Sequence, residues 1–308
     1  GKLDLEEYSY EKGSGTPIRA TEGTVLSRIP PRMKVRENAP IELPHIMVLI
    51  DDPDKKISEP LTKDVNRKQM SKIYSATLME NGGRITGSLL SKYQAKKIQE
   101  ALAELGDPQR FEEFYHAPGK PVLTYAMGDG NHSLATAKAC WEKLKPTLSP
   151  QEQETHPARY ALVELVNLHD DSLEFEPIHR VVFGVDPQKL LADLLAAYPG
   201  AHTGEGEGHQ FTYVLPGERG TITVPNPTAQ LAVGTLQNFL DRYLEENGGK
   251  VDYIHGEDVV EQLASQPGSI GFLLPAMSKD HLFPTVIFDG SLPRKTFSMG
   301  EAHDKRFY

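Results

Sequence analysis

The sequence predicts a mixed α/β fold (α+β), and three features of the chain predict it. Short apolar runs, such as residues 43–50 and 122–127, are typical of strands buried in a sheet. Segments with helical spacing of apolar residues, such as 91–105, alternate with these runs. The length of 308 residues suits one large domain or two ordinary ones. We expect two domains, at residues 1–156 and 157–308.

The first half of the chain should contain two strands and several helices. After a charged, proline-bearing stretch at residues 18–32, the runs LPHIMVLI and VLTYAM predict strands at 43–50 and 122–127. Asn81-Gly82-Gly83 predicts a turn. Apolar residues at helical spacing, and Ser149-Pro150 as a start signal, predict helices over 64–79, 91–105 and 132–145 and a short helix from 149.

The second half repeats the mixture of strands and helices. Asp186 as N-cap and Pro187 in the first turn predict a helix through Tyr198. Gly248-Gly249 ends a second helix over 235–247. The other predicted elements are strands at 159–166, 178–183, 251–254, 269–274 and 285–288, a hairpin of 211–215 with 221–224, and a helix over 257–264.

Net charge, cysteine content and the length of apolar runs exclude several classes of binding partner and site. With 33 basic and 43 acidic residues the net charge is -10, which makes nucleic acid an unlikely partner and leaves room for a local anion pocket. Cys140 is the single cysteine, so an internal disulfide and a cysteine-based metal site are excluded. No apolar run approaches the roughly 20 residues that span a bilayer. We expect a cytoplasmic protein, not bound to membranes, with a homodimer as an open alternative.

The segment YAMGDGNHS, residues 125–133, is the best candidate for a functional site. It reads as a strand end, a polar turn and a helix start. Gly128 and Gly130 allow positive φ and close approach of a ligand to the backbone. Asp129 or Asn131 can cap the helix.

The helix start itself predicts anion binding. Backbone N–H groups near Ser133 and the helix dipole favour an anion. His132 can donate to a phosphate oxygen or move a proton, and Asp129 can bind Mg²⁺ or act as a base. The alternative is a well-capped turn that binds nothing. The segment is neither a P-loop nor a dinucleotide fingerprint, because the required spacings are absent.

Two other segments supply candidate anion ligands. The first segment contains three arginines, one hydroxyl group and one carboxyl group, on Arg19, Arg28, Arg32, Thr24 and Glu22. Arginines in such a set can bind a phosphate or a carboxylate through paired hydrogen bonds. Glu22 is also a candidate base or metal ligand. His179-Arg180 begins an apolar strand and can supply a second anion contact. Ordinary loop or strand-edge ion pairs are the alternative for both segments.

Two further patterns receive a plainer interpretation. His255-Gly256, between a strand and a helix, is a weaker version of the same anion-ready geometry. Asp51, Asp52 and Asp54 lack calcium-loop spacing, and we interpret them as a solvated strand end.

Six segments together resemble one bacterial family, domain of unknown function 1015. They are IRATEGTVLSRIPPR, ELPHIMVLIDDP, GDGNHSLATAK, FEPIHRVV, DYIHG and LPRKTFSMGEAHDKRFY, spread over residues 18–308. The family often has Asp-Gly-His-His-Arg in the loop, whereas this chain has Asn131 and Ser133 at the first His and the Arg. One guanidinium is therefore missing from the implied anion site. Family members are usually longer at the front, and the chain opens on Gly1 like the interior of a protein, so we expect native sequence to be missing there.

The Asp-Gly-X-His loop before a helix is also similar to the phosphate-binding turn of the ParB/sulfiredoxin-like superfamily. That resemblance implies a ParB/sulfiredoxin-like N-terminal portion that binds a nucleotide phosphate, followed by a second α/β portion. Some members of the superfamily act as free-serine kinases.

The leading functional hypothesis is a nucleotide-dependent small-molecule kinase or phosphotransferase that takes ATP or another nucleotide with Mg²⁺. Phosphoryl transfer asks a protein for positioning and charge stabilisation, which this set of residues can supply. A phosphoester hydrolase using water at the same site is one alternative. A non-catalytic switch that binds a nucleotide or metabolite is another.

Overall fold

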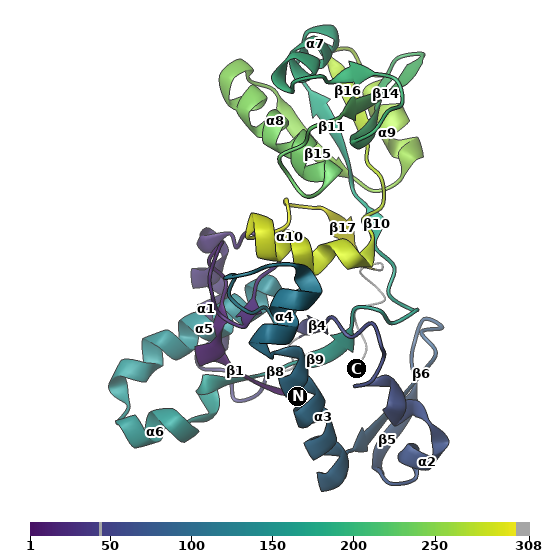
Figure 1. Cartoon of the computed structure of the whole chain (residues 1–308). Helices are drawn as coiled ribbons and strands as arrows, with labels where there is room; N and C mark the ends of the chain where they lie inside the picture. Colours follow the sequence, from purple (N-terminus) through teal and green to yellow (C-terminus); the bar gives the residue numbers. More distant parts are fainter. Residues whose placement is uncertain (43–44, 300–308) are drawn as a thin grey trace. The chain divides into compact units, whose positions relative to one another are not determined.

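The computed structural model describes residues 1–42 and 45–299 (Figure 1). These residues form two compact units, residues 1–173 and 174–299. The predicted domain boundary was 156/157. The strands at residues 160–162 and 164–167 follow that boundary, yet they pair with residues 2–4 and 47–50 and so belong to the first unit. Each unit is described by itself.

The first unit is built on a five-stranded mixed sheet. Its order is β2 (Tyr8–Ser9), β3 (Ile18–Arg19), β7 (Tyr125–Asp129), β4 (Met47–Ile50) and β9 (Glu164–Asn167). β3 runs parallel to β7, and β4 runs antiparallel to β7 and parallel to β9. The carboxyl end of β7 therefore lies beside the start of β4, and this end of the sheet carries the GDGNHS turn.

The remaining elements of the first unit surround this sheet. Two more strand pairs are present: β1 (Lys2–Asp4) with β8 (Tyr160–Leu162), and β5 (Ser71–Thr77) with β6 (Arg84–Leu89). The α-helices are α1 (Ile29–Arg36), α2 (Asp64–Arg67), α3 (Lys92–Leu105), α4 (Pro108–Tyr115), α5 (Asn131–Leu144) and α6 (Pro150–Thr155). Short 3₁₀ turns are η1 (Leu5–Glu7), η2 (Leu26–Arg28), η3 (Glu59–Thr62), η4 (Lys145–Thr147) and η5 (Pro157–Arg159).

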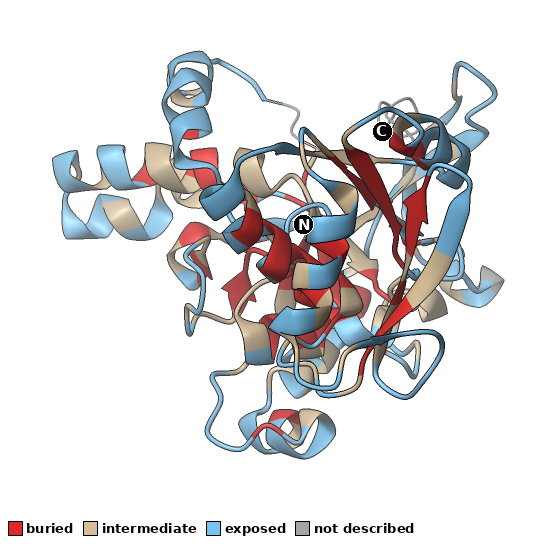
Figure 2. Ribbon diagram, turned by 90° about the horizontal axis from the view of Figure 1, so that it is seen from above, coloured by how far each residue is buried: buried red, intermediate tan, exposed pale blue. Residues whose placement is uncertain are grey.

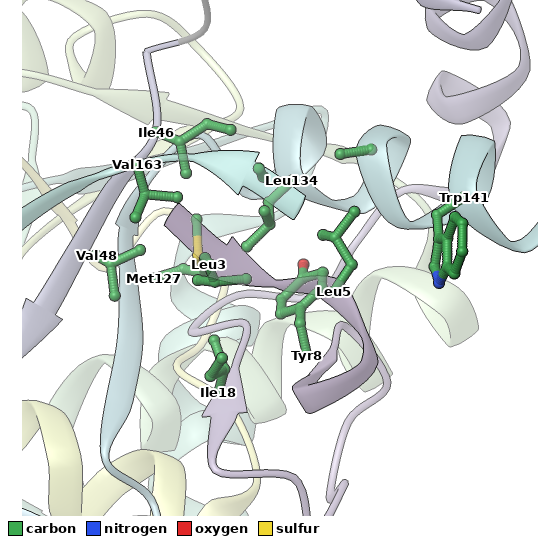
Figure 3. Packing of buried hydrophobic residues seen from close by; sticks show 12 residues of the cluster. Leu3, Leu5, Tyr8, Ile18, Ile46, Val48, Met127, Leu134, Trp141 and Val163 are labelled. Carbon is green, nitrogen blue, oxygen red and sulfur yellow. The ribbon is translucent and has the colours of Figure 1, made fainter. Parts of the chain in front are cut away.

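An apolar cluster fixes α5 against the sheet and the N-terminal segment (Figure 3). Leu134 and Trp141 of α5 are fully buried with Met127 of β7 and with Leu5 and Tyr8. The indole Nε1 of Trp141 donates to Glu6 at 2.6 Å. Burying side chains of this size stabilises a fold by roughly 1.5–3 kcal/mol each. The start of α5 is therefore held in place by the body of the helix.

The second unit contains a six-stranded sheet whose strand pairs are all antiparallel among the described residues. Its order is β12 (His202–Thr203), β14 (Glu218–Val224), β13 (His209–Leu215), β16 (Ser269–Leu273), β11 (His179–Phe183) and β15 (Lys250–Ile254). The other elements are α7 (Pro187–Ala197), α8 (Ala232–Asn247), α9 (Glu257–Ala264), η6 (Lys279–His281), α10 (Leu282–Asp289) and the pair β10 (Glu176–Pro177) with β17 (Phe297–Ser298).

The predicted mixed α/β fold is confirmed, since both units combine helices with sheets. Buried positions gather on strands and on the inward faces of helices (Figure 2). Within the described residues, no helix has the length and apolar character to cross a membrane.

Two local predictions were wrong. Residues 64–79 form the short α2 and then strand β5, because the β-branched and aromatic side chains of Ser71–Thr77 pair with β6 across the Asn81–Gly83 turn. Residues 285–288 belong to helix α10, a buried apolar run of the kind in which period cannot separate strand from helix. Part of the proline-bearing stretch forms α1, with prolines in its first turn. Residues 43–44 of the first predicted strand lie outside the described residues.

Candidate functional site

The GDGNHS turn joins β7 to α5 through a left-handed glycine. Gly130 has φ 86° and is the N-cap of α5, so the chain reverses there into the helix. The carboxylate Oδ1 of Asp129 accepts from the N–H of Gly130 at 2.8 Å, and the first helical hydrogen bond runs from Leu134 N to Gly130 O at 3.0 Å. Neither Asp129 nor Asn131 caps the helix through its side chain. The predicted side-chain cap is therefore wrong, because the αL glycine takes the N-cap position.

The two glycines of the turn face the neighbouring strand. A Cβ on Gly128 would lie 2.9 Å from the side chain of Leu49, and one on Gly130 would lie 2.5 Å from the carbonyl oxygen of His45. Both distances are shorter than real Cβ contacts allow. Close packing of β7 on β4, in addition to the positive φ of Gly130, therefore requires glycine at these positions.

The start of α5 has unsatisfied polar groups. The first N–H groups of a helix have no intrahelical acceptor, and Gly130 at the N-cap of α5 has no side chain that could accept from them. The first turn carries no acidic residue. Two buried side-chain atoms, Thr24 Oγ1 and Asn131 Oδ1, have no hydrogen-bond partner in the described part of the chain. Such groups are rare in folded proteins and mark places where a ligand or water belongs.

Residues 21–25 lie against this helix start. The hydroxyl of Thr21, 1% exposed, donates to the carbonyl of Met127 at 2.7 Å. Four residues later, the N–H of Val25 donates to Nε2 of His132 at 3.3 Å. The intervening Glu22 and Thr24 are therefore held near the α5 start. In the neutral His132 ring, Nε2 is the acceptor and Nδ1 carries the proton.

Asp129 has a partner that the sequence reasoning missed. His45, just before β4, places Nε2 at 3.5 Å from Oδ2 of Asp129. Met47 of β4 pairs with Asp129 of β7, which explains the proximity. A histidine inside the apolar run LPHIMVLI was the available signal, because an imidazole is an unusual residue at the start of a buried strand.

The predicted arginines lie in different surroundings. Arg28 and Arg32 are exposed, and Nη1 of Arg32 donates to the carbonyl of Arg28 at 3.0 Å. α1 lies beside α5 (Figure 1), and Arg32 and Ser133 are among the residues that line an open surface pocket of about 510 Å³. Arg32 therefore lines the same pocket as one residue of the first turn of α5.

Arg19 is held away from the turn. Its guanidinium is buried, and Nη2 donates to the carbonyl of Pro121 at 3.0 Å, before β7 begins. The GDGNHS turn lies at the other end of β7. Burial lowers the pKa of Arg19, and its Nε has no hydrogen-bond partner among the described residues.

His179 and Arg180 belong to the second unit. The guanidinium of Arg180 is fully buried and donates to Gln237 and to the carbonyls of Ile178, Arg294 and Lys295 at 2.5–3.1 Å. Nδ1 of His179 accepts from the N–H of Leu274 at 3.0 Å, and burial lowers the pKa of the ring. These surroundings favour a structural role for both side chains.

The interpretation of Asp51 and Asp52 as solvated is wrong. Both are buried, at 8% and 3% exposure. Asp51 accepts from Tyr115 Oη at 2.5 Å and lies 2.6 Å from Nε2 of His169, and burial raises the pKa of Tyr115. The carboxylate of Asp52 accepts from two backbone N–H groups. This cluster lies at the carboxyl end of β4, opposite the GDGNHS end, because β4 and β7 are antiparallel.

A metal held by protein groups alone has no candidate in the part of the chain that the structure describes, since no three His, Cys, Asp or Glu side chains gather suitably. Mg²⁺ usually needs only one or two carboxylates beside phosphate oxygens and water. Asp129 and Glu22 fit that smaller requirement.

Comparisons with known proteins identify the family of this chain. No curated protein matches the sequence. Solved structures with similar folds include a free serine kinase in complex with AMP (11% identity, 97% of this chain and 86% of that chain, TM-score 0.46). Another is SbnI with a C-terminal truncation from Staphylococcus aureus (10% identity, 98% of this chain and 82% of that chain, TM-score 0.49). A third is a conserved hypothetical protein from Pyrococcus furiosus (12% identity, 98% of this chain and 90% of that chain, TM-score 0.45). Such identities and TM-scores imply nothing about what this chain binds. The sequence model of the family described as "Protein of unknown function (DUF1015)" matches residues 1–243, and the chain belongs to that family.

Proposed function

We propose that this chain binds the terminal phosphates of a nucleotide at the start of α5 and acts as a small-molecule kinase or related phosphotransferase. The observation that carries the proposal is the α5 start, which combines an uncapped, acid-free first turn with the unpartnered atoms Thr24 Oγ1 and Asn131 Oδ1. A phosphate there would accept from the free backbone N–H groups and be stabilised by the helix dipole. The implied ParB/sulfiredoxin-like character of the first portion remains a prediction.

Each side chain near the helix start has a chemical role in this proposal. The hydroxyl of Thr24 would donate to a phosphate oxygen, and Asn131 Oδ1 would accept from a hydroxyl of the second substrate. Arg32 at the surface pocket and Nδ1–H of His132 would offset negative charge. Mg²⁺ arriving with the nucleotide would contact Asp129 or Glu22 and neutralise phosphate charge.

The proposed reaction is transfer of the terminal phosphoryl group. The bond between the terminal phosphorus and its bridging oxygen breaks, and the nucleoside diphosphate leaves with that electron pair. A new bond forms between phosphorus and the acceptor oxygen, whose proton passes to the carboxylate of Asp129 or Glu22. Asp129 has a second role, because its Oδ1 holds the Gly130 N–H and so orients the carboxylate.

The first experiment measures binding. Thermal shift and calorimetric titration with ATP, ADP and inorganic phosphate, each with and without Mg²⁺, should show a ligand-dependent rise in melting temperature. Thr24→Val removes the hydroxyl at constant shape and should weaken ATP binding about tenfold, because a hydrogen bond to a charged group is worth roughly 1.5–3 kcal/mol. Thr221→Val, at a half-buried threonine of the second unit, is the matched control and should bind normally.

The second experiment separates the three functions. ADP release only in the presence of a hydroxyl compound selects the kinase. Phosphate release without an acceptor selects the hydrolase, and binding without turnover selects the non-catalytic switch. If no phosphate compound binds the wild-type chain, the phosphate site is wrong and all three functions at it fall together.

A further inference from the structure

The β5–β6 ribbon, residues 71–89, is a two-stranded sheet without a core. Each residue of both strands is exposed or half-exposed, so neither face of the ribbon is buried. Among the described residues its two strands pair only with each other, which leaves one open edge on each. An isolated hairpin is marginally stable in water, and open edges readily pair with other chains.

Apolar side chains gather on and around this ribbon. Of the fifteen large apolar residues that are exposed in the described structure, seven fall within residues 65–93. They include Val65, Ile73, Tyr74, Met79, Leu89 and Tyr93, which are 46–67% exposed. Concentrations of exposed apolar surface usually mark interaction sites. Most of the six are aliphatic, which favours a protein partner over nucleic acid, whose bases stack on aromatic rings.

A longer segment, the ribbon with its flanks, reverses the charge of the chain. Residues 63–97 contain eight Lys and Arg and two Asp and Glu, a net charge of +6. The rest of the chain contains 25 basic and 41 acidic residues, a net charge of -16. The ribbon with its flanks, residues 63–97, is therefore opposite in net charge to the rest of its own chain, and the ribbon itself contributes Lys72, Arg84 and Glu80. Nucleic acid and anionic membranes fit less well, because the strongly acidic remainder repels both.

We infer that the β5–β6 ribbon is a dimerisation arm that docks on the acidic surface of a second copy of this chain. Two such contacts related by a two-fold axis would bury both ribbons and close the assembly. The apolar side chains would supply burial, and the basic side chains Lys72 and Arg84 would set the orientation of the contact. This inference is independent of the proposed phosphate chemistry.

The test is the oligomeric state of the full chain by sedimentation velocity over a range of concentrations. The wild-type chain should sediment at twice the mass of one chain. Lys72→Glu with Arg84→Glu should weaken the dimer at least tenfold, about 1.4 kcal/mol. Lys12→Glu with Lys34→Glu makes the same change in net charge at exposed positions outside the ribbon, and this control should remain dimeric. Rising salt should weaken the wild-type dimer because the contact is ionic in part.

A second measurement uses the wild-type chain alone. Hydrogen exchange in residues 71–89 should slow as protein concentration rises across the dimerisation range, because docking buries the ribbon. A wild-type chain that stays monomeric at high concentration overturns the inference. So does a dimer that is equally strong in the ribbon variant, or a ribbon that binds single-stranded nucleic acid while the chain remains monomeric.

Discussion

Two strand–glycine–helix turns, one in each unit, both pass through a glycine with positive φ and differ in ψ and in charge. β7 leads through Gly130 into α5, and β15 leads through Gly256 into α9, and both glycines have φ near +90°. Both N-cap residues are glycines, so neither has a side chain that could cap its helix. The first turn of α9 holds two carboxylates, Glu257 and Asp258, whereas that of α5 holds none.

The difference is whether the first turn of the helix contains acidic residues. We call the α9 turn, which contains them, the closed turn, and the α5 turn, which does not, the open turn. At α9 the chain's own acids complement the helix dipole, and Glu257 also pairs with Arg219 at 3.1 Å. At α5 the first turn holds no acid, the carboxylate of Asp129 accepts from the N-cap N–H of Gly130, and the buried atoms Thr24 Oγ1 and Asn131 Oδ1 lack partners within the described residues. Bare geometry made the two turns look alike, so charge in the first turn is the more informative signal for an anion site.

The largest expected effect tests the packing of the two glycines. Gly130→Ala should destabilise its unit by about 3 kcal/mol or more, because a left-handed backbone costs roughly 1–3 kcal/mol and the new Cβ would also meet the His45 carbonyl. Gly256→Ala should cost only the backbone strain, since nothing lies within 4 Å of its Cβ position. Chemical unfolding of both variants measures the difference. A loss in Gly130→Ala of only about 1–2 kcal/mol, the strain of a left-handed alanine alone, would mean that packing on β4 is unimportant.

The next effect places an acid in the open turn. Ser133→Glu puts a carboxylate in the first turn of α5, so phosphate binding should fall at least tenfold through like-charge repulsion, about 1.4 kcal/mol. Without ligand, the same variant should melt slightly higher, because the carboxylate complements the dipole. Ser133→Gln is the neutral control. Calorimetric ATP titration and thermal melts report the two opposite effects, and undiminished ATP affinity in Ser133→Glu would contradict the proposed site.

A third effect concerns His179, which neighbours the α9 turn. Burial lowers its pKa below 6.5, Glu257 raises it in part, and Arg180 and His255 lower it further. The unfolded chain therefore binds this proton more readily than the folded one. The resulting stability is complete above pH 6.5 and is lost as the pH falls toward the folded pKa.

Two measurements check the direction of this pH dependence. Unfolding of His179→Asn, which retains an acceptor for the Leu274 N–H, should depend less on pH below 6.5 than unfolding of the wild type. The remaining slope belongs partly to His209, whose pKa burial also lowers. NMR titration of Glu257→Gln should show a lower His179 pKa than in the wild type, and a higher one would reverse our assignment of Glu257.

The smallest effect removes an acid from the closed turn. Asp258→Asn should lower stability by about 0.3–1 kcal/mol, the usual value of a carboxylate at a helix start. Equilibrium unfolding at low ionic strength measures it, and the loss should shrink in high salt. A gain in stability would show that Glu257 alone already satisfies the α9 dipole.

Local signals carried most of the correct fold prediction. Apolar spacing predicted the helix over 91–105, whose start the structure closes with a capping box of Ser91 and Gln94, and Asp186 predicted the start of α7, where its side chain accepts from two backbone N–H groups. Short apolar runs were ambiguous, and tertiary burial decided that residues 282–289 form a helix. The β5–β6 ribbon escaped prediction because its apolar residues face solvent rather than a core.

Of the candidate site, the sequence alone identified the turn at residues 128–133 but not which distant residues contact it. The sequence marks residues 128–133, but the contact of Val25 with His132 spans 107 residues and depends on β3 running beside β7. The same topology sends Arg19 toward the opposite end of β7, and nothing local could show that. The burial of Asp51 likewise depends on the distant partners Tyr115 and His169.

Because its first turn lacks an N-cap side chain, the start of α5 should also report ligand binding through the hydrogen exchange of its own backbone amides. Amide protons without a protein acceptor exchange readily with solvent, so those of Asn131 and Ser133 should exchange faster than those deeper in the same helix, which Trp141 anchors. A bound anion would accept from these first-turn amides and slow their exchange, leaving the buried middle of α5 unchanged. Exchange at two residues would thus register a bound ligand in a measurement that needs no turnover.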